Sequence, residues 1–129
     1  MVPILNLIVL YAKDIQRTAS FYERCFDFTS RGSAAEGLVE LVAPSGGASI
    51  LVLQAGKGVK HGQAVIKLTF SVQDVEAFKE NSAALGLEFG GTHQANGYAF
   101  ANAKDPDGNS VSISNRAYRL TDVLDNPAK

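Results

Sequence analysis

The stretch Asp105-Pro106-Asp107-Gly108-Asn109 is followed by the alternating run Ser110-Val111-Ser112-Ile113-Ser114. The first five residues are typical of a tight turn, because proline presets φ, glycine accepts a positive φ, and Asp and Asn side chains hydrogen-bond the nearby backbone. Residues 98–104, just before the turn, also alternate. Two alternating segments around a strong turn predict a β-hairpin. Such hairpins are common, so its meaning depends on whether the rest of the chain follows the same plan.

The first half of the chain predicts one helix among four strands. Residues 4–12 are rich in aliphatic side chains and predict a strand. Asp14 is a candidate N-cap, and an apolar stripe at helical spacing predicts a helix that ends near Phe26-Asp27. The stripe consists of Ile15, Ala19, Tyr22 and Phe26. Further strands are predicted over residues 28–31, 38–42 and 48–54, with a loop at 32–37 and a turn at 44–47.

The second half repeats this order after a glycine- and lysine-rich connection at residues 55–62, the best candidate for a boundary. A strand is predicted over residues 65–72, and Asp74 is again a candidate N-cap. A helical stripe follows, with Gly86 as its stop, then a strand over 87–92, a loop over 93–97 and the hairpin. The stripe consists of Val75, Phe78, Ser82 and Leu85.

The two halves form an internal repeat. Asp74 follows Asp14 by 60 residues, and Pro106 follows Pro44, in the other turn, by 62. Identity between the halves is low, so the evidence is the order of elements, the shared Asp caps and the shared turns. Two βαβββ modules are therefore predicted, over residues 4–55 and 64–115.

Composition excludes several classes of protein. The chain has 129 residues, of which 46% are apolar and 19% charged, with a net charge of -1. These values predict a globular chain of one domain or two half-size modules, with no nucleic-acid or membrane partner. The apolar start predicts a first strand rather than a signal peptide. The single Cys25 fits a reducing, cytoplasmic compartment.

Two segments carry a resemblance to a known superfamily. Residues 10–15 run into Ser20-Phe21-Tyr22, and residues 98–100 run into the turn at 105–109. Both resemble the vicinal oxygen chelate superfamily, which includes glyoxalase I, bleomycin-resistance proteins and extradiol dioxygenases. The resemblance implies an α+β fold, in which two βαβββ modules form an incompletely closed curved sheet around a cavity, usually in a homodimer. It makes residues 1–129 a single glyoxalase-like domain with a C-terminal tail at 116–129.

Enzymes of this superfamily usually hold a divalent metal, which makes the ligand positions a test. The resemblance maps them onto Leu7, Lys67, Ser112 and one of three residues in the strand over 48–54, namely Ile50, Val52 or Gln54. Leucine offers no lone pair, a lysine ammonium repels a cation, and a neutral serine is a poor ligand for zinc or iron. We therefore expect no metal site and no cofactor.

Strand alternation assigns side chains to the predicted cavity. The first module would contribute Leu7, Val9, Tyr11, Ile50 and Val52. The second would contribute a set that is mostly polar, namely Lys67, Thr69, Ser71, Tyr98, Phe100, Asn102, Ser110, Ser112 and Ser114. One apolar and one hydrogen-bonding wall suit an amphiphilic ligand. The expected ligand-binding residues are Leu7, Tyr11, Lys67, Thr69, Tyr98, Phe100, Asn102 and Ser112.

Other titratable residues have simpler interpretations. Lys67 would anchor an anionic group, act as an amine nucleophile, pair internally, for instance with Glu40, or extend to solvent. His61 and His93 fall on no ligand position and are interpreted as surface residues. Cys25 falls among core positions of the first helix and predicts a buried thiol.

These features predict a metal-independent protein of the bleomycin-resistance type that binds a small organic molecule without changing it. The alternatives are a glyoxalase- or dioxygenase-like enzyme with an unusual metal site, and a metal-free lyase or isomerase. No catalytic residue is assigned, and neither the ligand nor the occurrence of a reaction is fixed by the sequence. In the tail, Tyr118, Leu120, Val123 and Leu124 suggest a short helix or arm, with disorder as the alternative.

Overall fold

The computed structural model describes residues 2–119, and these form two compact units. The first unit runs to Gln63 and includes the distant segment Asp105–Gly108. The second begins at Ala64, runs to Lys104 and resumes at Asn109. The division thus falls directly after the predicted boundary segment. No helix in residues 2–119 combines the length and the apolar character needed to cross a bilayer.

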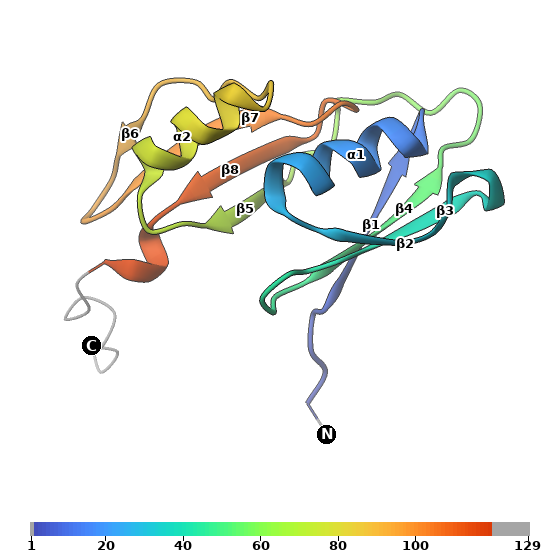
Figure 1. The fold of residues 1–129 in the computed structure, drawn as a ribbon, viewed down its shortest axis with the longest axis horizontal. Helices are drawn as coiled ribbons and strands as arrows, with labels where there is room; N and C mark the ends of the chain where they lie inside the picture. Colours follow the sequence, from blue (N-terminus) through green and yellow to red (C-terminus); the bar gives the residue numbers. More distant parts are fainter. Residues whose placement is uncertain (1, 120–129) are drawn as a thin grey trace. The chain divides into compact units, whose positions relative to one another are not determined.

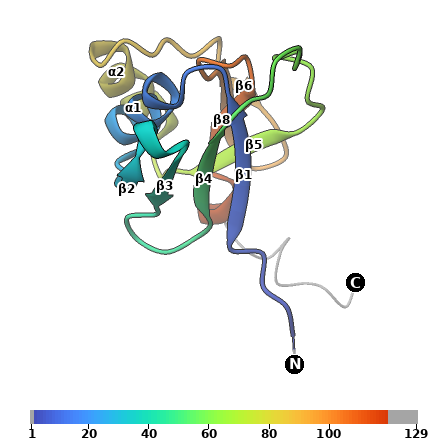
Figure 2. The same ribbon diagram turned by 90° about the vertical axis from the view of Figure 1, so that its right-hand side faces the viewer.

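The first unit is a four-stranded sheet with a helix on one face (Figure 1). Its strands lie in the order β1-β4-β3-β2, and β1 and β4 run parallel, side by side (Figure 2). The other neighbouring strands are antiparallel. In chain order the elements are β1 (Leu7–Ala12), α1 (Ile15–Phe26), β2 (Thr29–Ser33), a 3-10 turn (Ala34–Glu36), β3 (Leu38–Val42) and β4 (Ser49–Gln54).

The second unit repeats this topology. Its strands lie in the order β5-β8-β7-β6, with β5 and β8 parallel and the rest antiparallel. The elements are β5 (Lys67–Ser71), α2 (Val75–Ala84), β6 (His93–Gln94), β7 (Ala99–Lys104), β8 (Ser110–Ser114) and a 3-10 turn (Arg116–Tyr118). Two βαβββ modules of the same strand order confirm the predicted duplicated α+β fold.

One predicted strand is wrong. Residues 87–92 form no strand, and the element that pairs with β7 is the two-residue β6. Glycine stands at positions 86, 90 and 91, and glycine weakens a strand because it adds no side chain to pack and costs more entropy to order. The segment keeps a single backbone hydrogen bond to β7, from the Gly90 N–H to the Asn102 carbonyl at 2.9 Å.

Both helices begin where the sequence predicts. The Asp14 carboxylate accepts the Arg17 N–H at 3.1 Å, and the Asp74 carboxylate accepts the Ala77 N–H at 3.0 Å. Each carboxylate therefore satisfies one of the backbone donors that a helix start leaves unpaired. Helix α1 ends at Phe26, and its C-cap Asp27 takes a left-handed conformation with φ of 61°.

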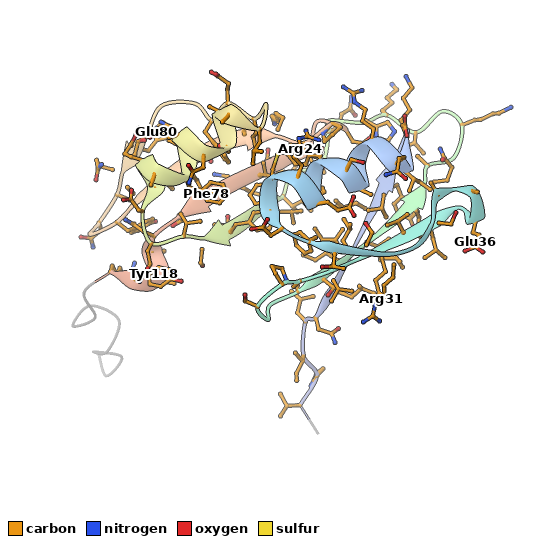
Figure 3. The ribbon with its side chains drawn as sticks, viewed as in Figure 1. Arg24, Arg31, Glu36, Phe78, Glu80 and Tyr118 are labelled. Atoms are coloured by element: carbon orange, nitrogen blue, oxygen red, sulfur yellow. The ribbon has the colours of Figure 1, made fainter. Side chains whose placement is uncertain are left out.

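The two helices pack differently on their sheets. Every residue of the predicted α1 stripe is buried, and the Tyr22 ring lies among the rings of Phe21 and Phe28. On α2 the predicted stripe is only partly buried, because Leu85 ends the helix and is 44% exposed. Phe78 lies on the side of α2 that faces its own sheet (Figure 3) and contacts Phe89 edge to face.

The turn of the β7–β8 hairpin is joined to α1 by buried carboxylates. The Tyr22 hydroxyl donates to Asp105 at 2.7 Å, and the Thr18 hydroxyl donates to Asp107. Asp107 also accepts the Lys13 N–H at 3.0 Å, and its own N–H donates to Asp105 at 2.8 Å. Both carboxylates are buried, so each hydrogen bond replaces one that water supplied in the unfolded chain.

Two glycines allow the connecting segment to reach this turn. Gly108 has φ of +81°, and a Cβ there would lie 2.9 Å from the Cα of Gly62. A side chain at position 108 would therefore strain the backbone, which has a positive φ, and would also overlap with the backbone of Gly62. The close approach therefore requires glycine at position 108. A Cβ at position 62 would make only ordinary contacts at 4.0 Å, and there glycine suits the φ of +79°.

The predicted C-terminal tail is described only in part. Arg116–Tyr118 forms the 3-10 turn, with Tyr118 at its end (Figure 3). The helix or arm that Leu120, Val123 and Leu124 suggest lies outside the described residues.

We expect Tyr22→Phe to lower the free energy of unfolding by about 1–3 kcal/mol, because the buried Asp105 carboxylate loses a hydroxyl donor while the ring shape is kept. Urea unfolding followed by circular dichroism measures the change. Tyr118→Phe is the matched control, since Tyr118 is 54% exposed. Equal effects of the two substitutions would contradict the proposed role of the Tyr22 hydroxyl.

Candidate functional site

One face of the second unit's sheet carries most of the predicted ligand-binding residues. Strand register places them in three rows, because paired residues in a sheet project to the same side. The rows are Lys67, Ser110 and Lys104; Thr69, Ser112 and Asn102; and Ser71, Ser114 and Phe100. We call these nine residues the polar face. The opposite side carries Leu68, Phe70, Val111, Ile113 and the alanines of β7, as the alternation predicts.

Cations and aromatic rings meet at one end of the polar face. The Lys67 Nζ lies 5.3 Å from the centroid of the Phe100 ring, a cation–π distance. His93 stacks on the same Phe100 ring, with the two ring centroids 5.1 Å apart. Tyr98 lies 6.2 Å from Phe100, and the Arg116 guanidinium lies 5.6 Å from the Tyr98 centroid. The predicted Lys67, Tyr98 and Phe100 are thus together.

The Lys67 ammonium is exposed and forms no ion pair with a described residue of its own unit. Glu40, the internal partner that the sequence suggested, faces the oppositely charged Arg31 across β2 and β3 in the first unit. The polar face has a second ammonium, that of Lys104, which donates to the Ser110 hydroxyl at 3.0 Å. Among the described residues, Lys67 makes no such hydrogen bond. The Lys67 charge is therefore open to an anion.

The centre of the polar face contains a buried acceptor without a donor. Asn102 Oδ1 is inaccessible to solvent and accepts no hydrogen bond from the described residues. Its neighbour Ser112 is 1% exposed, and the Ser112 hydroxyl makes only a 3.5 Å contact with the Ile113 carbonyl. Buried polar atoms are normally paired, since an unmade hydrogen bond costs about 1–3 kcal/mol. Asn102 and Ser112 are therefore the clearest sign in the second unit that a hydrogen-bonding partner is missing.

The first unit presents an apolar sheet face opposite α1. Leu7, Val9 and Tyr11 are 41%, 40% and 56% exposed, and β4 adds two residues to the same side, Leu51 and Leu53. Figure 3 shows that Arg31 also lies on the face away from α1. The predicted Leu7 and Tyr11 therefore share one exposed surface in their own unit.

The assignment of Ile50 and Val52 to that face is wrong. They are paired with Ile8 and Leu10, so they point toward α1, and they are 2% and 0% exposed. The error is one of parity, because a shift of one residue along a strand reverses the face of every side chain.

The residues at the superfamily's ligand positions do not fit a divalent metal. Leu7 offers alkyl carbon, Lys67 an ammonium and Ser112 a neutral hydroxyl. Gln54 lies on the helix side of its sheet, and its amide donates to the carbonyls of Ala12 and Lys13 at 3.3 and 3.0 Å. Within residues 2–119 no group of three His, Cys, Asp or Glu residues is placed to hold a metal ion.

The structure also places residues whose surroundings the sequence did not reveal. His61 lies beside the buried Asp107, with its Nδ1 3.7 Å from Oδ1, although the two are far apart along the chain. His93 and Arg116 contact the aromatic rings of the polar face. The contact of His61 depends on the tertiary fold and has no local signal. His93 is the cross-strand partner of Phe100, and this contact was missed because residues 93–97 were predicted to be a loop.

Two hydroxyl- and thiol-bearing side chains have raised pKa values. Burial is the main cause at Tyr22, whose pKa the adjacent Asp105 carboxylate raises further. Burial likewise raises the pKa of the Cys25 thiol, and this effect is larger than the lowering of the pKa by Arg24. Both groups stay neutral at physiological pH, and the predicted buried thiol at Cys25 is confirmed.

Comparison with known proteins gives consistent results. The pattern of the Glyoxalase/Bleomycin resistance protein/Dioxygenase superfamily matches residues 4–113. No curated protein matches the sequence. Among solved structures, lactoylglutathione lyase from Agrobacterium tumefaciens is similar, with 23% identity, a TM-score of 0.66 and coverage of 86% of this chain and 92% of that one.

Two further solved structures share the fold. An antibiotic-binding protein, TnmS3, from Streptomyces sp. CB03234 has 16% identity and a TM-score of 0.71, and the match covers 87% of this chain and 94% of that one. A fosfomycin resistance protein, FosX, from Listeria monocytogenes has 19% identity and a TM-score of 0.72, and the match covers 88% and 93%. At these identities the likeness concerns the fold.

We expect Asn102→Leu to leave the free energy of unfolding unchanged or to raise it by up to about 1 kcal/mol, because the substitution removes a buried acceptor that has no donor. Asn115→Leu is the matched control. Asn115 accepts the Ala99 N–H at 2.8 Å, and its loss should cost about 1–2 kcal/mol. Chemical denaturation of both variants without ligand provides the comparison, and a larger loss at Asn102 than at Asn115 would show that Asn102 is structural.

Proposed function

This chain belongs to the Glyoxalase/Bleomycin resistance protein/Dioxygenase superfamily, and we propose that it is a metal-independent protein that binds a small organic molecule. The ligand is anionic or amphiphilic, and the polar face of the second unit holds its charged group. The observation that carries the proposal is the combination of an unpaired ammonium at Lys67 with a buried, unpaired acceptor at Asn102.

Lys67 accounts for the anionic end of the ligand. Its ammonium has no carboxylate partner among the described residues of its unit, and the rows beside it carry the hydroxyls of Thr69 and Ser112. An ammonium with adjacent hydroxyl donors is suited to a carboxylate, phosphonate or similar oxyanion. Because its Nζ lies over the Phe100 ring, the charge is kept at the aromatic end of the face.

The aromatic rings account for a flat, less polar part of the ligand. The Phe100 ring contacts two other rings. Its centroid lies 5.1 Å from that of His93 and 6.2 Å from that of Tyr98. Ring faces offer dispersion and offset stacking to a planar ligand group, and the cations above them favour electron-rich rings.

Asn102 adds a requirement that distinguishes ligands. Its Oδ1 accepts no hydrogen bond from the described residues and is inaccessible to solvent, so a fitting ligand has to displace the groups that cover it and then donate an N–H or O–H to it. A ligand with an anionic group near a hydroxyl or amide satisfies both Lys67 and Asn102. A simple anion without a donor satisfies only Lys67.

Binding without turnover and without a metal is supported by the chemistry of the side chains. The polar face contains no carboxylate, and the residues at the superfamily's ligand positions are poor metal donors. The antibiotic-binding protein with the same fold is a precedent for binding on this scaffold. We further propose a homodimer in a cytoplasmic, reducing compartment, in line with the exposed apolar face of the first unit and the single buried Cys25.

Calorimetry against aromatic hydroxy-acids, peptide antibiotics and simple carboxylates, with and without chelator, tests the proposal. We expect the hydroxy-acids to bind more tightly than matched carboxylates that lack the hydroxyl, with no effect of chelator. Lys67→Met should weaken binding about tenfold or more, because the anion loses its counter-charge. Lys57→Met, an exposed lysine of the connecting segment, is the control and should bind normally.

Three outcomes would overturn the proposal. Binding that disappears with chelator would indicate a metal-dependent enzyme of the glyoxalase or dioxygenase kind. Conversion of a bound compound, followed by mass spectrometry, would indicate a metal-free lyase or isomerase. Equal affinity in the Lys67→Met and Lys57→Met variants would show that the anion is held elsewhere.

We expect the purified protein to be a dimer by size-exclusion chromatography with light scattering. Val9→Lys, at a 40% exposed position of the apolar face, should shift the mass toward the monomer, because it places a charge within an apolar contact. Lys57→Met is again the control. A monomeric wild-type protein at micromolar concentration would contradict the dimer.

A further inference from the structure

We propose that the first unit contains a second binding site, separate from the polar face, for a phosphate-type oxyanion. The site is a pocket of about 210 Å³ where the start of α1, the connecting segment and the β7–β8 turn meet. All three segments belong to the first unit. Lys13, Asp14, Arg17, Thr18, His61, Pro106 and Asp107 line the pocket. A water molecule occupies about 30 Å³ of liquid volume, so the space accommodates a tetrahedral oxyanion with several waters.

Three potential cations line this pocket and come from different segments. Lys13 precedes α1, Arg17 lies in its first turn, and His61 lies in the connecting segment. Among the described residues, neither the Lys13 ammonium nor the Arg17 guanidinium forms an ion pair. Their positive charges are therefore available to a ligand.

The two carboxylates of the pocket are engaged by protein donors. Asp107 accepts the Lys13 N–H with one oxygen and the Thr18 hydroxyl with the other, and His61 lies beside it. Asp14 accepts the Arg17 N–H as the cap of α1. A divalent cation would have to displace these donors and would meet two fixed positive charges, so the pocket chemistry favours an anion.

The proposed site does not depend on free backbone donors at the start of the helix. The Arg17 N–H is bound by Asp14, and the Thr18 N–H donates to the Asp14 carbonyl at 3.1 Å. The side chains of Lys13, Arg17 and His61 must therefore supply the recognition. A guanidinium binds a phosphate with two parallel hydrogen bonds, which an ammonium and an imidazole N–H complement as point donors.

The two histidines of the chain allow a direct test by imidazole carbon–proton NMR. His61 reports on the pocket, and His93, which stacks on Phe100, reports on the polar face. Titration with inorganic phosphate at pH 6 should shift the His61 signal in a saturable way and leave the His93 signal in place. Sodium chloride of equal ionic strength is the control for screening.

Arg17→Gln should weaken phosphate binding about tenfold. Arg24→Gln, on the last turn of the same helix (Figure 3) and outside the pocket, should bind as the wild type does. Glycerol phosphate is a second probe. If it binds at least as tightly as inorganic phosphate, the natural ligand is a phosphomonoester, and weaker binding indicates free phosphate.

The inference is overturned if His61 does not shift, or if its shift is the same in chloride or in the Arg17→Gln variant. A phosphate-dependent shift of His93 alone would also overturn it, since the anion would then occupy the polar face. The His61 and His93 signals are separate, so failure of this inference and failure of the proposed ligand binding are distinguishable.

Discussion

The buried contact between helix α1 and the turn at Asp105–Gly108 is the interaction on which the rest of the structure depends. Two carboxylates in this turn accept the hydroxyls of Tyr22 and Thr18 and the N–H of Lys13. Carboxylates are costly to bury, and each of these donors offsets part of that cost. The turn that joins the two central strands of the second sheet is thereby part of the first unit.

The duplicated modules keep one topology and have different surfaces. Both sheets have the same strand order, and the helix side of each is built mostly from apolar residues. On the other side, the first sheet presents Leu7, Val9 and Tyr11, and the second presents serines, Thr69, Asn102 and Lys67. Polar side chains on a sheet contribute little to folding when they lack partners. Their concentration on one sheet is therefore better explained by binding than by stability.

Local sequence signals predicted most of the elements. The Asp caps, the α1 stripe and the turn with its two alternating strands all act between neighbouring residues, and the structure has each of them. The errors arose where a local signal was weak. Residues 87–92 form no strand, because the glycines at 86, 90 and 91 weaken strand pairing there. The parity of β4 could not be set from its own residues, because both of its faces are apolar, so Ile50 and Val52 were assigned to the wrong side.

The sequence by itself determined the repeat, the superfamily resemblance and the chemistry of the polar face, because turns, caps and alternation are short-range properties of the chain. The tertiary structure alone decided which distant groups meet. It placed Asp107 beside Thr18 and His61, and left the acceptor of Asn102 without a donor. At Asp105-Pro106-Asp107-Gly108-Asn109 the sequence predicted only a turn. The buried roles of its carboxylates follow from packing against α1, which no spacing along the chain encodes.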